Sequence, residues 1–214
     1  MTSTKSRLVS FLRTEEYKAI SEVKIDGKIL DVGGSKYAGY HELIKGKHEF
    51  IVGNIDSSFG TDLIFNAENQ WPFDGDHFDA TMLINVLEHL SDYRTALSEA
   101  NRVTKKGGVI IGVVPFMFNV HGSPGDYFRY TKTNLVKILS DAGFGDIEVR
   151  ELGTGAFSVV YHCLMGLYRF RFVSRAVMAL CRKFDELLAR IKPNNLMSKT
   201  YMPLGYFLKA IKPH

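Results

Sequence analysis

Short apolar segments alternate with helix-like segments along most of the chain. The apolar segments predict strands at 28–32, 49–55, 62–65, 78–84, 109–116, 146–152 and 203–211. Helices are predicted over 6–23, 37–45, 91–103 and 131–142, with Ser91 and Thr131 as N-caps and Gly107-Gly108 ending the third helix. Buried strands that alternate with helices are typical of a parallel sheet covered on both faces.

Residues 153–200 interrupt this alternation and are predicted to be helical. Apolar side chains recur there every three or four residues, at Val173, Val177, Leu180, Phe184, Leu187, Leu188 and Ile191. Arg175, Arg182, Glu186 and Arg190 occupy the opposite side. The chain has a net charge of +4, but residues 153–214 hold 10 Lys/Arg against 2 Asp/Glu, whereas residues 1–152 hold 17 against 21. The basic character therefore belongs to the C-terminal third.

A glycine turn follows the first predicted strand. The strand ends in Asp31 and opens on Gly33 and Gly34, and residues without a side chain let a ligand approach the backbone closely. The dinucleotide pattern G-x-G-x-x-G is absent, which argues against a nicotinamide enzyme. In parallel sheets, ligands bind outside the carboxyl ends of the strands. We therefore expect a ligand site at this turn.

Three further segments follow the turn at short, regular intervals, at 66–73, 79–90 and 99–108. In this order, the four motifs resemble the class I S-adenosylmethionine-dependent methyltransferases, and in particular the type 11-like branch, whose fourth strand leads into V-L-E-H-L. The pattern H-x-x-P-x-D-Y-F-R-Y-T at 121–131 is similar to that of bacterial methyltransferases found with polysaccharide and secondary-metabolite pathways. The resemblance covers residues 25–152 and the last strand.

The resemblance implies an α/β fold with a Rossmann-like, seven-stranded, mostly parallel sheet, helices on both faces and a helical insertion before the last strand. The length of 214 residues suits a single domain over residues 1–214. Within it, residues 1–24 form an N-terminal helix, 25–152 the cofactor-binding core, 153–200 the insertion, and 201–214 the last strand and tail. The implied cofactor is S-adenosylmethionine.

Eight residues receive cofactor-binding roles from the resemblance. Asp31 and the backbone of Gly33 and Gly34 would face the methionine part, Asn54 or Asp56 would bind the ribose hydroxyls, Asn66 and Ala67 would read the adenine edge, and Asn85 would lie beside the cofactor. The sequence departs from the family pattern at Asn54, where an acid is usual, and in the shortened glycine turn. Two simpler roles stay open: Asp31 as a cap of the turn and Asn85 as an ordinary strand-end residue.

The loop after the fifth strand is dense in polar and aromatic residues. His121 is the candidate general base and His89 the second choice, with a packed, non-catalytic histidine as the alternative for each. Tyr127, Arg129 and Tyr130 are candidate substrate-binding residues, but Arg129 could equally tie the loop down through Asp126. Because no pair of carboxylates has metal-ligand spacing, we expect no metal.

These features predict an enzyme that methylates an oxygen of a sugar or glycan intermediate or of another small hydroxylated metabolite. The [DN]-P-P-[YF] motif of amino-group methyltransferases is absent after the fourth strand, which favours an oxygen acceptor. One rival is a non-catalytic cofactor-binding subunit that docks to a partner through 153–200. Another is a nucleotide-sugar or nicotinamide enzyme of the same general fold.

Expectations for location and partners follow from composition. The N-terminus has no apolar signal segment, and Cys163 and Cys181 lack metal spacing and lie in hydrophobic sequence, which favours packed thiols in the cytoplasm. Residues 156–192 form either a lid or homodimer surface with solvated arginines, or a basic amphipathic helix that rests on the anionic inner membrane surface. Nucleic acid is not an expected partner, because the basic residues do not alternate with stacking aromatics.

Overall fold

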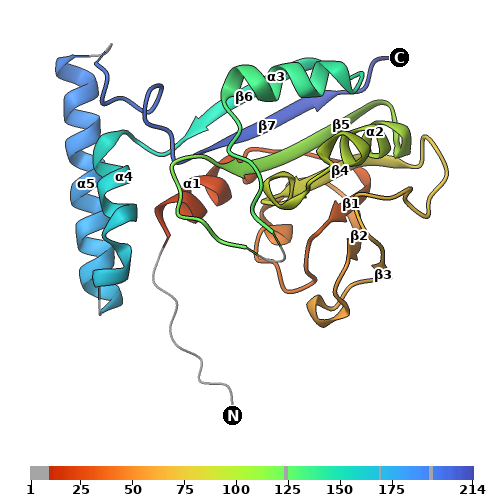
Figure 1. The fold of residues 1–214 in the computed structure, drawn as a ribbon, viewed down its shortest axis with the longest axis horizontal. Coiled ribbons are helices and arrows are strands. Elements are labelled where there is room, and N and C mark those ends of the chain that lie inside the picture. The colour runs from red at the N-terminus through yellow and green to blue at the C-terminus, as the bar shows by residue number, and fades with distance from the viewer. Residues whose placement is uncertain (1–9, 123–124, 169, 193–194) are drawn as a thin grey trace.

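A seven-stranded sheet, with strand order β3-β2-β1-β4-β5-β7-β6, forms the centre of the structure (Figure 1). The structure is a computed structural model, and it describes residues 10–122, 125–168, 170–192 and 195–214. β1 pairs in parallel with β2 and β4, whereas β7 runs antiparallel to both β5 and β6. The strands are β1 (Gly27–Val32), β2 (His48–Asn54), β3 (Leu63–Ile64), β4 (Phe78–Ile84), β5 (Thr104–Pro115), β6 (Gly145–Leu152) and β7 (Gly205–Ile211). The predicted Rossmann-like α/β fold is confirmed.

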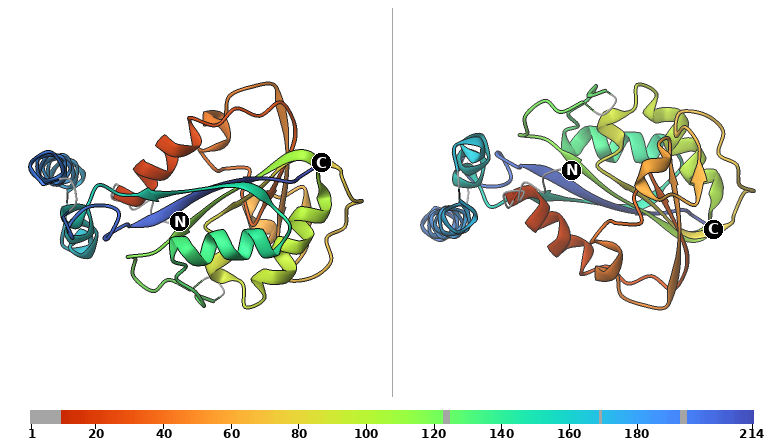
Figure 2. Two further views of the ribbon diagram at one scale, coloured as in Figure 1. Left: turned by 90° about the horizontal axis from the view of Figure 1, so that it is seen from above. Right: turned by 90° about the horizontal axis from the view of Figure 1, so that it is seen from below.

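Helices cover both faces of the sheet, as Figure 2 shows, and each face has its own buried cluster. α1 packs on one face, where Phe11 and Ile20 are buried against Phe207 of β7. α2 and α3 cover the other face through the fully buried Leu97 and Leu135. The helices are α1 (Phe11–Ile20), α2 (Tyr93–Val103), α3 (Lys132–Asp141), α4 (Ala156–Cys163) and α5 (Arg171–Ile191), with 3-10 turns η1 (His41–Leu43), η2 (Ser57–Phe59), η3 (Leu87–His89) and η4 (Met165–Leu167).

Several predicted element ends are wrong. Asp92, not Ser91, is the N-cap of α2, because its carboxylate accepts from the Thr95 amide at 3.2 Å while the Ser91 hydroxyl donates to Glu68. β5 already begins at Thr104, so the two glycines lie inside the strand. Thr131 does cap α3. Residues 6–9 of the first predicted helix, and residues 123 and 124 of the loop motif, lie outside the described residues.

The helix predicted over 37–45 is also wrong, since this segment contains only the 3-10 turn η1. Its conformation is determined by side chains. The Tyr40 hydroxyl donates to Asp31 Oδ2, and His41 Nε2 bonds the same oxygen, each at 2.7 Å. These two bonds draw the segment against the end of β1. Gly39, which precedes both residues, also disfavours a continuous helix.

The predicted insertion between β6 and β7 is a pair of helices at one end of the sheet (Figure 1). α4 lies between α5 and the sheet, and the buried Asp185 of α5 accepts hydrogen bonds from the amides of Phe157 and Ser158, both at 3.0 Å, at the start of α4. Cys181 is buried as expected, but Cys163 is exposed. Within the described part of the chain, none of the helices combines the length and the apolar character that crossing a membrane requires.

Candidate functional site

The carboxyl ends of β1, β2 and β4 border a pocket of about 430 Å³, which we call pocket A. Its lining combines a glycine turn, polar side chains and an apolar wall, and consists of Val32, Gly33, Asn54, Ile55, Asp56, Phe59, Phe65, Asn66, Ala67, Glu68, Asn85, Val86, His89 and Leu90. Six of the residues predicted to bind the cofactor are among them. The volume lies in the range of small-molecule sites. A shallower hollow at Gln70–Asp74 and His77 lies at the amino end of β4, away from the edge where parallel sheets bind ligands.

The glycine turn leaves no room for side chains. Gly33 has a positive φ of 71°, and a Cβ on it would lie 2.6 Å from Val86 Cγ2. A Cβ on Gly34 would lie 1.9 Å from Asp31 Oδ2. The Gly34 carbonyl accepts a 2.8 Å hydrogen bond from Asn54 Nδ2. The turn therefore presents bare backbone at the floor of pocket A.

We expect Gly34→Ala to destabilise the protein by about 2 kcal/mol, because the new methyl group must displace the buried Asp31 carboxylate. Thermal unfolding should show a midpoint lower by about 4–8 °C. Gly166→Ala is the matched control, since a Cβ there meets no atom within 4 Å. The Gly34→Ala cost should shrink in an Asp31→Ala background. An equal cost in both backgrounds would contradict this account.

The structure corrects the predicted position of Asp31. Its carboxylate is fully buried behind the turn, where it accepts from Tyr40 and His41, and it does not line pocket A. Burial raises the pKa of Asp31, and the two hydrogen bonds oppose that rise. Asp31 therefore lies behind the turn and holds Tyr40 and His41, without the turn-capping hydrogen bond of the simpler alternative.

The two candidates for the ribose hydroxyls differ in their freedom to bind. Asn54 is nearly buried, and both ends of its amide are engaged, since Nδ2 donates to Gly34 and Oδ1 accepts from the Asp56 amide at 3.2 Å. Asp56 is exposed on the rim of pocket A, and one of its oxygens accepts from the Ser58 amide at 2.8 Å. Asp56 is thus the carboxylate at the mouth of the pocket, while Asn54 holds the turn.

The predicted adenine-side residues do meet in pocket A. Asn66 Oδ1 accepts from the Glu68 amide at 2.9 Å, which fixes the bend that carries Ala67 into the pocket wall. Ile55 and Phe59, which sequence reasoning missed, add an apolar surface and are 57% and 43% exposed. Such exposed apolar side chains on a pocket wall suit a flat aromatic ligand.

A second pocket of about 240 Å³, pocket B, adjoins pocket A and shares Asn85 and His89 with it. Its other lining residues come from α1 and from the end of β5 and the loop after it, and are Ser10, Leu12, Arg13, Glu16, Pro115, Phe118 and His121. Asn85 lies between the pockets with a positive φ of 54°, and its Nδ2 donates to Glu16 Oε2 at 3.0 Å. Two compartments therefore meet at the carboxyl end of β4.

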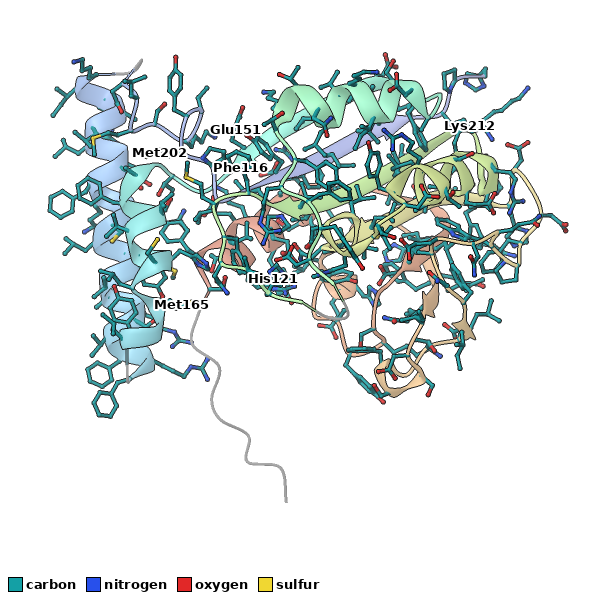
Figure 3. The ribbon with its side chains drawn as sticks, in the orientation of Figure 1. Phe116, His121, Glu151, Met165, Met202 and Lys212 are labelled. Atoms are coloured by element: carbon teal, nitrogen blue, oxygen red, sulfur yellow. The ribbon has the colours of Figure 1, made fainter. Side chains whose placement is uncertain are left out.

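The two candidate catalytic histidines lie close together beside pocket B, with His121 on the loop after β5 (Figure 3). Their ring centroids are 5.1 Å apart. His121 Nδ1 bonds the Asn119 carbonyl at 3.1 Å, and His89 Nδ1 bonds the Gly125 carbonyl. Because a carbonyl oxygen only accepts, each Nδ1 carries a proton, and in the neutral imidazole Nε2 keeps its lone pair.

The loop residues proposed for the substrate separate into two groups. Arg129 forms a two-pronged ion pair with Asp126, with Nη2 to Oδ2 at 2.7 Å, so it ties the loop down. That arginine holds the pKa of Asp126 well below its usual range. Tyr130 is buried in the core with its hydroxyl donating to the Leu87 carbonyl at 3.0 Å, so it is not a surface for substrate. Tyr127, in contrast, is 57% exposed.

Two buried acids near the site were missed as candidates. Glu16 is 1% exposed, pairs with Arg13 at 2.8 Å and has a raised pKa because of its burial. Glu88 is fully buried, neither of its carboxylate oxygens has a hydrogen-bond partner in the described part of the chain, and burial raises its pKa to about 8. The V-L-E-H-L motif contains Glu88, but nothing in it indicates that the carboxylate turns inward.

Comparisons with known proteins agree with this geometry. Residues 43–112 match the model of a methyltransferase domain family. Solved methyltransferase structures match 94% of this chain with TM-scores of 0.55 and 0.57. The chain has a class I methyltransferase fold. No curated protein sequence matches the chain.

Among similar structures, a S-adenosylmethionine-dependent methyltransferase from Archaeoglobus fulgidus is 20% identical, with a TM-score of 0.55, and the match covers 94% of this chain and 91% of that one. Haemonchus contortus phosphoethanolamine N-methyltransferase 2, in complex with S-adenosylmethionine, is 16% identical with a TM-score of 0.57. The match covers 94% of this chain but 53% of that one, so this chain spans about half its length. The [4+2]-cyclase SpnF is 18% identical with a TM-score of 0.57, over 94% of this chain and 81% of that one.

At these identities the structures establish the fold alone. SpnF is named as a [4+2]-cyclase and not as a methyltransferase, so the fold by itself does not identify the reaction. The matched domain and the structures with the cofactor or its product are in agreement with S-adenosylmethionine, the cofactor that the sequence predicted for this methyltransferase fold. The acceptor must be inferred from the site.

Proposed function

We propose that this chain is an S-adenosylmethionine-dependent methyltransferase that methylates an oxygen of a sugar or glycan intermediate or of another small hydroxylated metabolite. The observation that carries the proposal is the pair of pockets joined at Asn85 and His89. One compartment suits a methyl donor, the other an acceptor, and a histidine pair lies at their junction.

Pocket A fits the cofactor on the features of its own residues. The floor at Gly33 is bare because a Cβ would collide with Val86, the rim carries the Asp56 carboxylate, and the wall at Ile55 and Phe59 is apolar. Asp56 would bind the ribose hydroxyls, and Asn66 with the Ala67 backbone would hold the adenine edge. When bound, S-adenosylmethionine supplies a methyl group on a positively charged sulfur that is a good leaving group.

Pocket B would hold the acceptor. Its lining presents the Arg13–Glu16 pair, His89 and His121 beside Leu12 and Phe118, a mixture of polar and apolar groups that suits a hydroxylated ligand. His121 Nε2, free because Nδ1 is engaged by Asn119, would accept the hydroxyl proton as the oxygen–carbon bond forms. Tyr127, exposed on the same loop, would extend the acceptor surface. The chain's other task is to align the two reactants and exclude water.

A transfer assay tests the proposal. Protein incubated with S-adenosylmethionine and a panel of hydroxylated sugars and small phenols or alcohols should release S-adenosylhomocysteine with at least one acceptor. Cofactor binding without turnover on any acceptor, amines included, would favour the rival function of a non-catalytic subunit. Turnover on amines alone would support methyl transfer but contradict the proposed oxygen acceptor.

The helical insertion is proposed to rest on an anionic membrane surface, giving access to a lipid-linked acceptor. α5 carries an apolar stripe whose members are each at least 44% exposed, namely Leu180, Phe184, Leu187 and Ile191, and Phe184 at its edge also stacks on Phe157 of α4. Exposed basic side chains flank it at Arg175, Lys183 and Arg190. Residues 156–192 hold seven Lys/Arg and two Asp/Glu. Each basic residue near an anionic surface contributes about 1 kcal/mol.

Flotation with vesicles tests this surface. The protein should float with phosphatidylserine-containing vesicles, less so in high salt, and not with pure phosphatidylcholine. Leu180→Glu/Leu187→Glu should reduce the floated fraction at least about tenfold, because two exposed leucines that would enter the membrane are lost, while Val136→Glu on α3 should not. Failure to float, together with a dimer in solution that the double variant abolishes, would assign the face to a second copy and overturn the proposal.

A further inference from the structure

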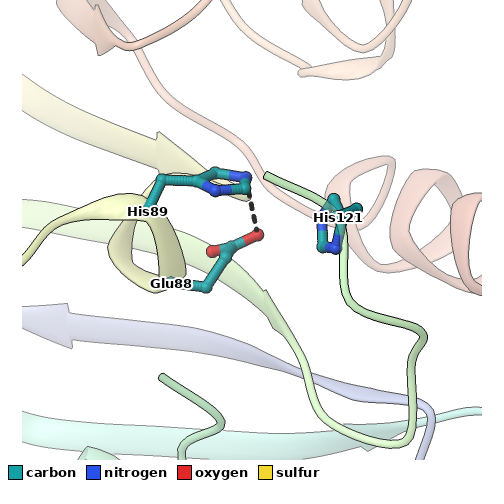
Figure 4. A group of neighbouring side chains, drawn as sticks. All are labelled: Glu88, His89 and His121. Carbon is teal, nitrogen blue, oxygen red and sulfur yellow. Dashed lines mark ion pairs between the residues drawn. The ribbon is translucent and has the colours of Figure 1, made fainter. Parts of the chain in front are cut away.

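We propose that Glu88, His89 and His121 bind a divalent transition-metal cation at the junction of the two pockets. Among the described residues, one ligand atom from each of these three side chains lies within 4.8 Å of the other two. Figure 4 shows the Glu88 carboxylate directed toward His89, with His121 facing the pair from the loop after β5. The inference departs from the expectation of no metal, which rested on the absence of paired carboxylates.

The Glu88 carboxylate is the first observation that points to a cation. It is fully buried, and neither of its oxygens has a hydrogen-bond partner among the described residues. A carboxyl group buried without a partner is costly to ionise, in line with the raised pKa of Glu88, and buried carboxylates that do carry a charge are paired or coordinate metals. Arg129 acts on the Glu88 carboxyl electrostatically without an ion pair at 4.0 Å or less, and His89 Nε2 lies 3.8 Å from Glu88 Oε1, beyond hydrogen-bond length. A cation between them would satisfy both groups.

The two imidazoles are already oriented as metal ligands usually are. Each Nδ1 donates to a backbone carbonyl, that of Gly125 for His89 and that of Asn119 for His121, so each Nε2 keeps its lone pair. Metal-bound histidines typically donate their other ring N–H to a carbonyl or carboxylate, which fixes the tautomer and the ring direction. The loop that carries His121 is itself held by the Arg129–Asp126 pair.

The donor set indicates the kind of cation. Two imidazole nitrogens and one carboxylate oxygen suit Zn²⁺ or another first-row divalent ion, and catalytic zinc sites often leave a fourth position for water or substrate. Bonds of about 2.1 Å require ligand atoms about 3.4 Å apart. The Glu88–His89 pair at 3.8 Å is close to that, and binding would draw His121 inward. The fourth position would face pocket B.

The inference rests on the proposed function and refines one part of it. An acceptor hydroxyl bound to the cation would lose its proton more readily, as metal-bound water does; the proton would pass to solvent water, the oxygen would take the methyl group, and S-adenosylhomocysteine would leave. His121 would then hold the cation instead of taking the proton itself. Zinc binding can be measured without any acceptor, so failure of this inference and failure of methyl transfer are distinguishable.

Calorimetric titration with Zn²⁺ after removal of metals by chelation is the test. We expect one equivalent to bind, and at least about 100-fold weaker binding for Glu88→Gln and for His121→Ala. His214→Ala, at the exposed C-terminus, should bind as the wild type does. Titration with Co²⁺ should give the visible absorption of a low-symmetry, four- or five-coordinate site.

Each variant's fold is checked by its affinity for S-adenosylhomocysteine, which should remain unchanged. Wild-type protein that binds no Zn²⁺, or a stoichiometry and affinity that survive both Glu88→Gln and His121→Ala, would overturn the metal site while leaving methyl transfer intact. Absence of S-adenosylhomocysteine binding by the wild type would instead reject the proposed function.

Discussion

Replacing His121 by alanine should lower turnover by about 10²–10⁴-fold, the usual contribution of a general acid or base. The imidazole lines pocket B and has its Nε2 free, so its removal takes away the group that handles the acceptor proton, directly or through a cation. S-adenosylhomocysteine should bind with unchanged affinity, since His121 does not line pocket A. Steady-state release of S-adenosylhomocysteine with the acceptor found in the transfer assay measures the first effect, and calorimetry the second.

Val120→Ala is the matched control for this change. The neighbouring Val120 is on the same loop and 83% exposed, so its truncation should alter neither quantity. If His121→Ala turned over at the wild-type rate, the histidine would be a packing residue and the catalytic account of the loop would be rejected.

Replacing Ala67 by tryptophan should weaken S-adenosylhomocysteine binding at least about 100-fold, because the indole would fill the part of pocket A assigned to adenine. Ala67 is only partly buried at the edge of the core, and its backbone carbonyl, which Trp71 Nε1 contacts at 3.1 Å, is kept by the substitution. The unfolding midpoint should therefore stay within a few degrees of the wild type.

Leu167→Trp serves as the control for adding an indole to the surface, since Leu167 lies in the insertion and is 79% exposed. It should bind as the wild type does. If Ala67→Trp bound S-adenosylhomocysteine with the affinity of the wild type, the adenosyl group would bind elsewhere, and pocket A would not be the cofactor site.

The fold followed from sequence because its signals are local. Apolar runs bounded by turns gave the strands, and the Thr131 cap was identified because a capping hydroxyl bonds an amide only three residues away. The helix prediction for residues 37–45 failed because the conformation of this segment depends on hydrogen bonds from Tyr40 and His41 to a carboxylate on β1. A hydrogen bond between separate elements leaves no periodic trace in the sequence.

The candidate site was predicted in part, for the same reason. Gly33 of the glycine turn, Asn66, Ala67 and Asn85 all line pocket A because motif spacing places them at or just after strand ends. Tyr130 was misassigned, because its burial depends on packing against Tyr93 of α2, with ring centroids 5.7 Å apart. Glu16 was missed, because its partner Asn85 is 69 residues away along the chain.

The central claim is that pocket A is shaped for an adenosyl sulfonium compound. Calorimetric titration of the wild-type protein with S-adenosylhomocysteine, with NAD⁺ and with a nucleotide sugar tests it most directly. We predict saturable binding of one equivalent of S-adenosylhomocysteine, competed by S-adenosylmethionine, and no measurable binding of the other two. Binding of NAD⁺ or the nucleotide sugar without binding of S-adenosylhomocysteine would contradict it.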